Sequence, residues 1–252
     1  MLKKRIIPVL LLKNGRLVKT IQFDKYRDVG NPVATAKIYN AQRADELIIL
    51  DIEASAENRG ALCGIIKEMA EECLMPLGVG GGVRSLDDIR LLLLNGADKI
   101  VVNTAAVEQA GFVRQAAEKF GSSTIVLSID YRTDSTGQPR VFIRGGKQPT
   151  VLDPVDFAKK MVAEGAGEIV ITSIDRDGVM QGLDIPFIKK MVSAVNVPVI
   201  CCGGVGSLSD FKTAFAEAGA SAVGAGSIFH FTDQSIIKTR RYLVGENVNV
   251  RK

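Results

Sequence analysis

The sequence is poor in the residues from which metal sites are usually built. It contains a single histidine, His230, and four cysteines, none of which form a Cys-x-x-Cys pair. A structural zinc site needs several such ligands at close spacing, so we expect no metal. Cys201 and Cys202 lie in an apolar stretch and are expected to pack in the core. Cysteines without a disulfide framework are typical of a reducing cytoplasm, which is the location we expect.

Long apolar stretches are also missing. No run of about 18 apolar residues is present, which argues against a membrane-spanning helix. The N-terminal stretch MLKKRIIPVLLLK has a basic start, but it lacks the longer apolar region and cleavage site of a signal peptide, so we interpret it as the first strand. Lys and Arg form no run interleaved with aromatics, and the net charge is only +4. We therefore expect neither nucleic acid nor a membrane as partner, while a phosphorylated ligand would suit the mild charge.

What the chain does contain is a regular alternation of short β-rich stretches and helical patterns. Hydrophobic residues make up 46% of the 252 residues, which is ordinary for a globular protein with a substantial core. The strand candidates are Arg5–Leu11, Glu46–Asp51, Met75–Gly80, Lys99–Asn103, Thr124–Asp130, Glu168–Ser173, Val197–Cys202 and Ser221–Ala225. Two helical patterns, Ser85–Leu94 and Ser207–Glu217, open with a serine suited to an N-cap. Eight β/α units predict an α/β fold, a single TIM (β/α)8 barrel over residues 1–252; the alternative is a doubly wound sheet.

The two halves of the sequence resemble each other. DELIILDIEAS from Asp45 aligns with GEIVITSIDRD from Gly167, and GGVRSLDDI from Gly81 aligns with GGVGSLSDF from Gly203 at the same spacing. NGADKIVVNTAA and EAGASAVGAGSIF follow in the same order, with one residue inserted in the second. Three similarities in order indicate a duplicated half-barrel, with halves of about 1–122 and 123–252.

Each half carries a Gly-Gly pair after one strand and a small polar pair after the next. The pairs are Gly81-Gly82 with Asn103-Thr104, and Gly203-Gly204 with Gly226-Ser227. Glycine lets backbone N–H groups approach an anion, a hydroxyl adds a donor, and a helix N-terminus adds a positive dipole end. The repeated arrangement predicts two phosphate sites and a long bisphosphate ligand. The alternative is that the glycines only make tight turns.

Two further segments are candidate covers of the barrel mouth. The segment from roughly Lys13 to Asn31 reads as a long loop, and such loops are often lids. Lys19, within it, could close over a phosphate as a mobile cation or could be a solvated surface lysine. The segment Tyr131–Lys147, rich in Gly, Arg and Thr, is a candidate hairpin over the mouth.

Asp130 ends the fifth predicted strand, where a carboxylate in a TIM barrel is typically catalytic. The half-barrel alignment places Leu11 at the equivalent position of the first strand, after one small gap. Leucine cannot transfer a proton, and the neighbours Leu10 and Leu12 cannot either. A mechanism that needs a carboxylate on each side of the ligand has therefore lost one of them.

Nearly the whole chain resembles the cyclase subunit of imidazole glycerol phosphate synthase, the glutamine-dependent enzyme of histidine biosynthesis. The stretches that carry the resemblance are RIIP, NGRLVK, DELIILDI, VGGGVRS, NGADKIVVNTAAV, GAGEIVITSIDRDG and SIFHF. The resemblance implies a TIM barrel with two phosphate sites and a ribulosyl aminoimidazole bisphosphate substrate. It also implies a heterodimer in which a glutaminase docks on the N-terminal face and ammonia travels through the barrel. We expect no cofactor.

Matched residue by residue, Asp130 takes the place of one of the family's two catalytic aspartates. Leu11 takes the place of the other, where the family has a CLDVKDG-like stretch and this chain has VLLLKNG. One phosphate site would comprise Gly82, Asn103 and Thr104. The other would comprise Asp177, Gly178, Gly204, Gly226 and Ser227. The active-face polar positions are Asp51 and Thr172. The salt-bridged gate at the barrel's bottom would comprise Arg5, Glu46, Lys99 and Glu168, and Asp98 would lie at the glutaminase interface.

The gate positions are also unusual in composition. They lie at the starts of strands one, two, four and six, so two bases and two acids meet at the N-terminal mouth. Buried charges must be paired, which makes an alternating ring physically reasonable. The alternative is a structural plug, because the bottom of a TIM barrel usually serves stability.

Four functions remain open at this point. The first is an ammonia-receiving subunit, similar to paralogues in surface-polysaccharide gene clusters that, with a glutaminase, supply a separate sugar amidotransferase. The second is an authentic histidine-pathway cyclase that tolerates Leu11. The third is a non-catalytic scaffold that docks and activates the glutaminase. The fourth is the sister isomerase of the same fold, which has no partner; the matched gate and the stretch VNTAAVE argue against it.

Overall fold

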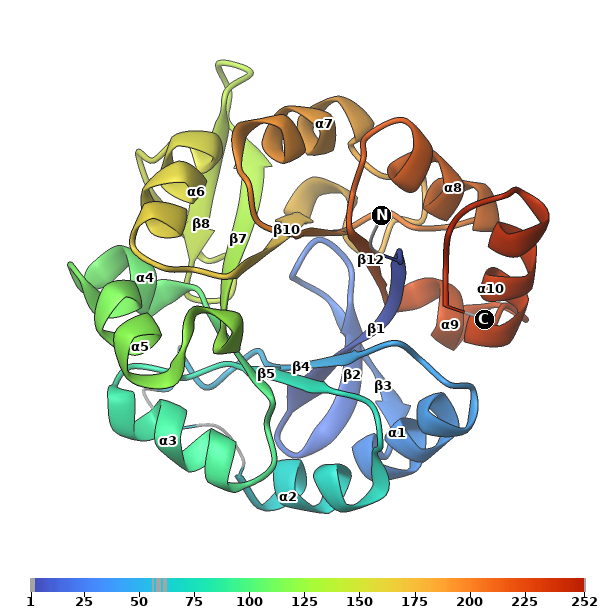
Figure 1. The fold of residues 1–252 in the computed structure, drawn as a ribbon, viewed down its shortest axis with the longest axis horizontal. Helices are drawn as coiled ribbons and strands as arrows, with labels where there is room; N and C mark the ends of the chain where they lie inside the picture. The colour runs from blue at the N-terminus through green and yellow to red at the C-terminus, as the bar shows by residue number, and fades with distance from the viewer. Residues whose placement is uncertain (1–2, 56, 58–59, 61–62, 252) are drawn as a thin grey trace.

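The computed structural model describes residues 3–55, 57, 60 and 63–251. In this part of the chain, eight parallel strands close into a barrel that helices surround (Figure 1). In spatial order the barrel strands are β1 (Arg5–Lys13), β4 (Leu47–Asp51), β5 (Leu77–Gly80), β6 (Lys99–Val102), β7 (Ile125–Thr133), β10 (Glu168–Ser173), β11 (Val199–Cys202) and β12 (Ala222–Ala225). Strand β12 pairs with β1 and closes the ring. The predicted TIM barrel is confirmed, and the doubly wound alternative is wrong.

The helices follow the strands as the β/α alternation predicts. They are α1 (Pro32–Ala41), α2 (Cys63–Glu72), α3 (Leu86–Leu94), α4 (Thr104–Glu108), α5 (Phe112–Phe120), α6 (Pro154–Ala163), α7 (Ile185–Ala194), α8 (Leu208–Ala216), α9 (Ser227–Phe231) and α10 (Ile236–Gly245). Ser85 and Ser207 begin α3 and α8 with capping boxes, so both predicted N-caps are confirmed. The outer side chains of the strands and the inner faces of the helices form the main apolar core.

The inside of the barrel is a packed layer of side chains. Successive residues of a strand point to opposite faces, so every second residue faces inward. The inner layer consists of Ile7, Ile48, Val101, Val126, Val170, Ile200, Cys202 and Ala222. Large residues face small ones: a Cβ on Gly80 would lie 2.8 Å from Val101 Cβ, and a Cβ on Gly224 would lie 2.3 Å from Cys202 Sγ. Cys201 and Cys202 are both buried, as expected for core cysteines.

Two antiparallel hairpins rise from the carboxyl ends of the strands. β1 turns at Asn14 and Gly15, both with positive φ, into β2 (Arg16–Thr20), which pairs with β3 (Tyr26–Gly30). The interpretation of residues 13–31 as a loop is therefore wrong. The Asn-Gly dipeptide, whose two left-handed residues suit a tight hairpin turn, was the sequence signal for it.

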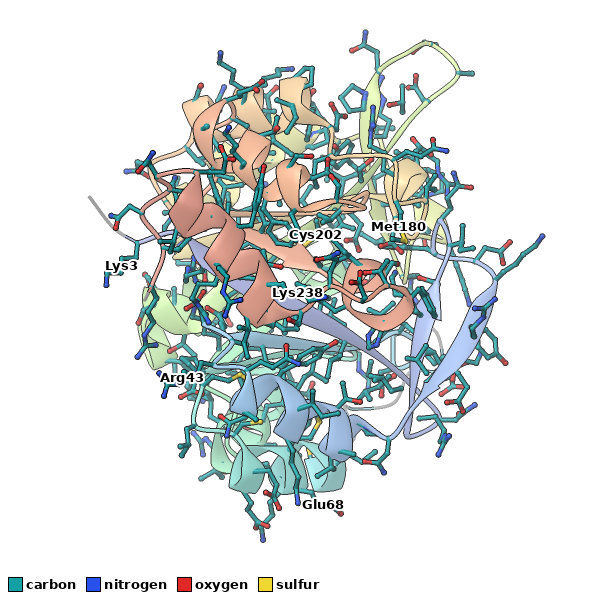
Figure 2. The ribbon with its side chains drawn as sticks, turned by 90° about the vertical axis from the view of Figure 1, so that its right-hand side faces the viewer. Lys3, Arg43, Glu68, Met180, Cys202 and Lys238 are labelled. Carbon is teal, nitrogen blue, oxygen red and sulfur yellow. The ribbon has the colours of Figure 1, made fainter. Side chains whose placement is uncertain are left out.

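The second hairpin joins β7 to β8 (Pro139–Ile143), which continues to β9 (Gln148–Pro149), so the segment predicted as a hairpin is one. Figure 2 shows the barrel from the side, with both hairpins projecting from one end and Lys3 at the other. The two ends of the barrel therefore carry different structures: hairpins above the strand ends, and short loops where the strands begin.

Candidate functional site

A cavity of about 330 Å³ opens at the hairpin end of the barrel. Residues at the carboxyl ends of the strands form its floor and walls, and the β2–β3 hairpin contributes Lys19, Thr20 and Tyr26. The predicted site residues that line it are Leu11, Lys19, Asp51, Gly82, Asn103, Thr104, Asp130, Thr172, Asp177, Gly178, Gly204, Gly226 and Ser227. Closure of the barrel therefore brings residues from both halves of the sequence to one cavity, as TIM-barrel active sites require.

Asp130 lies on the inner face of β7, beside Thr172 of β10 in the strand register. Asn103 Nδ2 is 3.4 Å from Asp130 Oδ2, a long hydrogen bond. Burial raises the pKa of Asp130 to about 7; hydrogen bonds from Thr172 and Ser128 oppose this rise, and the carboxylate of Asp177 adds to it. A carboxyl that titrates near neutrality can both donate and accept a proton, which suits a general acid or base.

Ser128 was not among the predicted site residues, although it also lines the cavity. It is two residues before Asp130 on the same strand and its side chain is buried. The signal that could have found it is the alternation of β7, because residues two apart share one face of a strand.

Leu11 occupies the place in β1 that Asp130 occupies in β7. Pro8 pairs with Ala225, as Leu127 pairs with Val102. Ala225 and Val102 each precede the small polar pair of their half, so three residues further along the strands Leu11 stands where Asp130 does. This register supports the half-barrel alignment without any choice of gap.

The apolar character extends beyond this one position. Leu11 pairs with Leu50 in the register, whereas Asp130 pairs with Thr172. Leu11 is 9% exposed and lines the cavity. Leu10 and Leu12 belong to the outer core and do not line the cavity, so neither replaces it. One side of the cavity is therefore apolar where the other carries a carboxyl and a hydroxyl.

Lys19 is not a solvated surface residue. It lies in β2, is only 6% exposed, and its Nζ is 2.8 Å from Asp177 Oδ2. Thr20 Oγ1 also donates to Asp177. Gly178 allows this close approach, because a Cβ there would lie 2.3 Å from the carbonyl oxygen of Thr20. The buried ion pair between Lys19 and Asp177 thus holds the hairpin over the cavity. The interpretation of residues 13–31 as a loop gave no reason to expect this pair.

The predicted second phosphate cradle combines glycine backbone with a buried hydroxyl. Gly203 and Gly204 both have positive φ, so no other residue fits easily there. Ser227 begins α9, where N–H groups have no partner within the helix. Its side chain is buried, and among the described residues its Oγ has no hydrogen-bond partner. A Cβ on Gly226 would lie 3.3 Å from Lys19 Cδ, which places the lysine stem beside the same cradle.

The first cradle is more occupied by contacts within the protein. The N–H of Gly82 donates to Ser55 Oγ at 3.3 Å, and the N–H of Arg144 donates to Thr104 Oγ1 at 3.1 Å. Asn103 Nδ2 donates to the carbonyl oxygens of Ser128 and Phe142. An anion at this cradle would compete with these contacts, whereas the second cradle offers an unused hydroxyl.

Asp51 is buried at the end of β4, on the cavity wall. Its Oδ1 is 3.2 Å from the N–H groups of both Glu53 and Ala54, which it therefore holds in the turn after the strand. Among the described residues, no group of three or more His, Cys, Asp or Glu side chains is placed to hold a metal ion. No helix in the described ranges is long and apolar enough to cross a membrane.

The four predicted gate residues form a closed ring of ion pairs at the opposite end of the barrel. Glu46 Oε2 is 2.8 Å from Arg5 Nη1 and 2.8 Å from Lys99 Nζ. Glu168 pairs with Lys99 at 2.7 Å through Oε2 and with Arg5 through Oε1. Both glutamates are buried, while the two cations are partly exposed. Buried carboxylates paired on both sides satisfy the requirement that charges in an interior be compensated.

Asp98 lies on the same end of the barrel, in the turn before β6. It is exposed, and its Oδ2 accepts the N–H of Leu77 at 2.8 Å. The side chain therefore anchors the start of β5 and still presents charge on the surface next to the ring.

A family model described as "Histidine biosynthesis protein" matches residues 5–235 of the chain. The matched span begins with the first residue of β1 and ends one residue before α10. It contains all the barrel strands, the cavity and the ring of ion pairs.

Proposed function

The chain belongs to the histidine biosynthesis protein family, and on this premise we propose that it is the synthase-type barrel subunit of a glutamine amidotransferase pair. In this proposal a glutaminase docks at the end bearing the ring of ion pairs, and ammonia passes through the barrel to the cavity. The final acceptor is a surface-polysaccharide sugar, which a separate amidotransferase converts. The chain no longer performs the histidine-pathway cyclisation at an ordinary rate.

The observation that carries the proposal is the contrast between the two ends of the barrel. The ring of two acids and two bases is complete. The cavity, however, has kept Asp130 and has leucine at the symmetric position and at its neighbour in the register. A chain with a complete ring at one end, but with only one of two cooperating proton-transfer groups at the other, is poorly suited to two-sided acid–base catalysis. It is better suited to delivering ammonia.

In the cavity, the residues of this chain have separable roles. Asp130, with its pKa near neutrality, is the group that can exchange a proton with a bound molecule. The cradle of Gly204, Gly226 and Ser227 binds a phosphate of a phosphorylated ligand, with Lys19 beside it. To reach that phosphate, Lys19 must share or give up its bond to Asp177.

One alternative is favoured by a specific observation. An authentic cyclase would need both cradles and at least one titrating carboxyl at the mouth, and Asp130 lies in the cavity with both cradles. A non-catalytic scaffold would need neither. Ammonia-dependent turnover of the histidine-pathway bisphosphate by the purified protein separates the authentic cyclase from the scaffold and from the proposed function, since neither of these predicts ordinary turnover.

The docking part of the proposal is tested at Asp98. The chain is co-expressed with a candidate glutaminase, and binding of the purified proteins is measured by calorimetry. Asp98→Lys reverses the surface charge and is expected to abolish binding. Asp98→Asn is the matched control, because its side-chain oxygen can still accept the N–H of Leu77. Binding of the lysine variant with unchanged affinity would contradict the proposed interface.

A further inference from the structure

An ion pair between Lys13 and Glu53 lines the cavity on the side of Leu11. Lys13 follows Leu11 by two residues on β1, so both side chains lie on the inner face of the strand. The Nζ of Lys13 is 2.7 Å from Glu53 Oε1 and 4.0 Å from the centre of the Tyr26 ring. Glu53 lies in the turn after β4, where its N–H donates to Asp51 Oδ1. The backbone of Glu53 is therefore held in place at the rim of the cavity.

The second carboxylate oxygen of Glu53 is not used within the protein. In the described part of the chain, the buried Oε2 of this side chain has no hydrogen-bond partner. A buried acceptor without a donor is unfavourable, and in native proteins it often accompanies a bound molecule or a catalytic role. The torsion that rotates a glutamate carboxylate is soft. A small rotation, with Lys13 following on its flexible stem, therefore presents Oε2 to a molecule in the cavity.

The other half of the barrel carries the equivalent ion pair, and there both carboxylate oxygens are used. The alignment of the two halves places Asp175 at the position of Glu53. Arg132 likewise takes the place of Lys13. Arg132 Nε is 3.0 Å from Asp175 Oδ1, and Asp175 Oδ2 accepts the N–H of Thr133 at 3.1 Å. This second pair does not line the cavity. The repeat thus does not account for the unused oxygen, which occurs in the half whose ion pair lines the cavity.

Glu53 and the second cradle lie on either side of the first strand. Strand β1 pairs with β12 on one side and with β4 on the other. Ser227 follows β12 and Glu53 follows β4, so Leu11 lies between them in the strand order. Two strand spacings of about 4.8 Å separate the ends of β12 and β4, which gives a span of about 10 Å. One phosphorylated molecule of hexose size can therefore contact both residues while its carbon skeleton lies over Leu11.

The cavity has room for one phosphate without the loss of contacts within the protein. In the first cradle, the Thr104 hydroxyl donates to Asn103 Oδ1 and accepts the N–H of Arg144. In the second cradle, Ser227 Oγ has no hydrogen-bond partner among the described residues. A single phosphate at the second cradle gains a donor that is otherwise unused. A second phosphate at the first cradle would have to replace hydrogen bonds that the protein already makes.

We propose that the Glu53–Lys13 pair binds a hydroxyl group of a sugar monophosphate whose phosphate occupies the cradle at Ser227. The C–H groups of the sugar lie against Leu11. This ligand differs from the bisphosphate that the sequence resemblance implies. The inference rests on the proposed function for the position of the phosphate, and it goes beyond that function because it names the class of ligand and the residues that select it.

The charge of the pair favours a hydroxyl group over an amine. A protonated amine next to Glu53 would also lie beside the Lys13 ammonium group, and like charges at close range repel each other. A hydroxyl group can donate to Glu53 Oε2 and accept from Lys13 with the same oxygen, so both partners are satisfied. Leu11 and its neighbour in the register, Leu50, both line the cavity and offer an apolar wall to the C–H groups of a sugar.

Calorimetry on the purified chain tests the class of ligand. The probes are inorganic phosphate, butyl phosphate and fructose 6-phosphate. Butyl phosphate has a phosphate and an apolar tail but no hydroxyl group. We expect fructose 6-phosphate to bind at least about tenfold more tightly than butyl phosphate, as for one hydrogen bond to a charged group. Equal affinities for these two probes, or two bound phosphates per chain, would overturn the proposal.

Two variants test the residue. Glu53→Met keeps the length of the side chain and removes both acceptor oxygens. It should reduce the preference for fructose 6-phosphate over butyl phosphate at least about tenfold. Asp175→Asn is the matched control, because it changes the equivalent ion pair outside the cavity and should leave this preference as in the wild type. The preference is a ratio of two affinities, so a smaller folded fraction of a variant does not alter it. An undiminished preference in Glu53→Met would overturn the role of Glu53.

The result with inorganic phosphate separates this inference from the proposed function. A wild type that binds phosphate without preferring fructose 6-phosphate overturns the sugar site and leaves the cradle and the glutaminase pair unaffected. A wild type that binds no phosphate overturns the cradle of the proposed function, and this inference with it. A crystal structure with fructose 6-phosphate should place a hydroxyl oxygen at about 3 Å from Glu53 Oε2, the normal hydrogen-bond distance. A sugar directed away from Glu53 would contradict the proposal.

Discussion

Replacing Leu11 by aspartate should give the cavity a second proton-transfer group opposite Asp130. The side chain lies at the position equivalent to Asp130 and lines the cavity. We expect the wild type to show little or no ammonia-dependent cyclisation of the histidine-pathway bisphosphate. Because a positioned acid or base is typically worth about 10²–10⁴ in rate, Leu11→Asp should raise the rate by up to that factor.

The same substitution should cost stability. Leu11 is largely buried, and burial of a leucine side chain contributes about 1.5–3 kcal/mol. The new carboxylate would also share the cavity with Asp51, Asp130 and Asp177. We expect a total loss of about 3–5 kcal/mol, which for a chain of this size lowers Tm by roughly 10 °C. The like charge should raise the pKa of Asp130 further and move the pH optimum of any gained activity upward.

The assay compares the wild type, Leu11→Asp and Leu11→Asn at saturating ammonium, with melting curves for each. The asparagine variant is the matched control, because it is polar and of similar size but cannot transfer a proton. Adding Leu50→Thr to Leu11→Asp reproduces the Asp130–Thr172 pair in the other half and should increase the gain. A wild type that turns over like an ordinary cyclase would refute the reasoning. Equal activity in the aspartate and asparagine variants would also refute it.

Three further predictions concern the carboxyl, the cradles and the ring. Because the folded pKa of Asp130 is about 7, against about 4 in an unfolded chain, its contribution to stability is complete below pH 4 and is lost as the pH rises through 7. The Tm of Asp130→Asn should therefore rise relative to the Tm of the wild type as the pH rises from about 4 to about 7. A difference in Tm that does not change with pH would contradict the raised pKa. Ser227→Ala should weaken binding of inorganic phosphate in calorimetry by about tenfold, as expected for one lost hydrogen bond to an anion, and Thr104→Ala should weaken it less; the reverse order would be contrary evidence. Glu168→Gln should lower the free energy of unfolding in urea by about 3–5 kcal/mol, because it leaves Arg5 and Lys99 with a single carboxylate; a loss under 1 kcal/mol would show that the ring is solvated.

Much of the fold was predictable because its signals are local. Strands and helices each have their own periodicity of apolar residues. The starts of two helices are indicated by Ser85 and Ser207, because a capping box spans only four residues. The Asn-Gly turn after β1 is an equally local signal of the β1–β2 hairpin. The position of Asp130 at a strand end was readable for the same reason, since a TIM barrel places its chemistry at strand ends.

The sequence by itself thus determined the barrel, the two Gly-Gly and small polar pairs, the place of Asp130 at a strand end and the leucine at the symmetric position. Only the tertiary structure decided which polar groups have ion-pair or hydrogen-bond partners within the protein. It showed that Lys19 is buried against Asp177 and that Glu46 Oε1, near Gly78, has no hydrogen-bond partner among the described residues. The physical reason is that these contacts join residues far apart in sequence, and their distances depend on the register and closure of the whole barrel. Local patterns specify on which face of a strand or helix a side chain lies, but not which residues it contacts there.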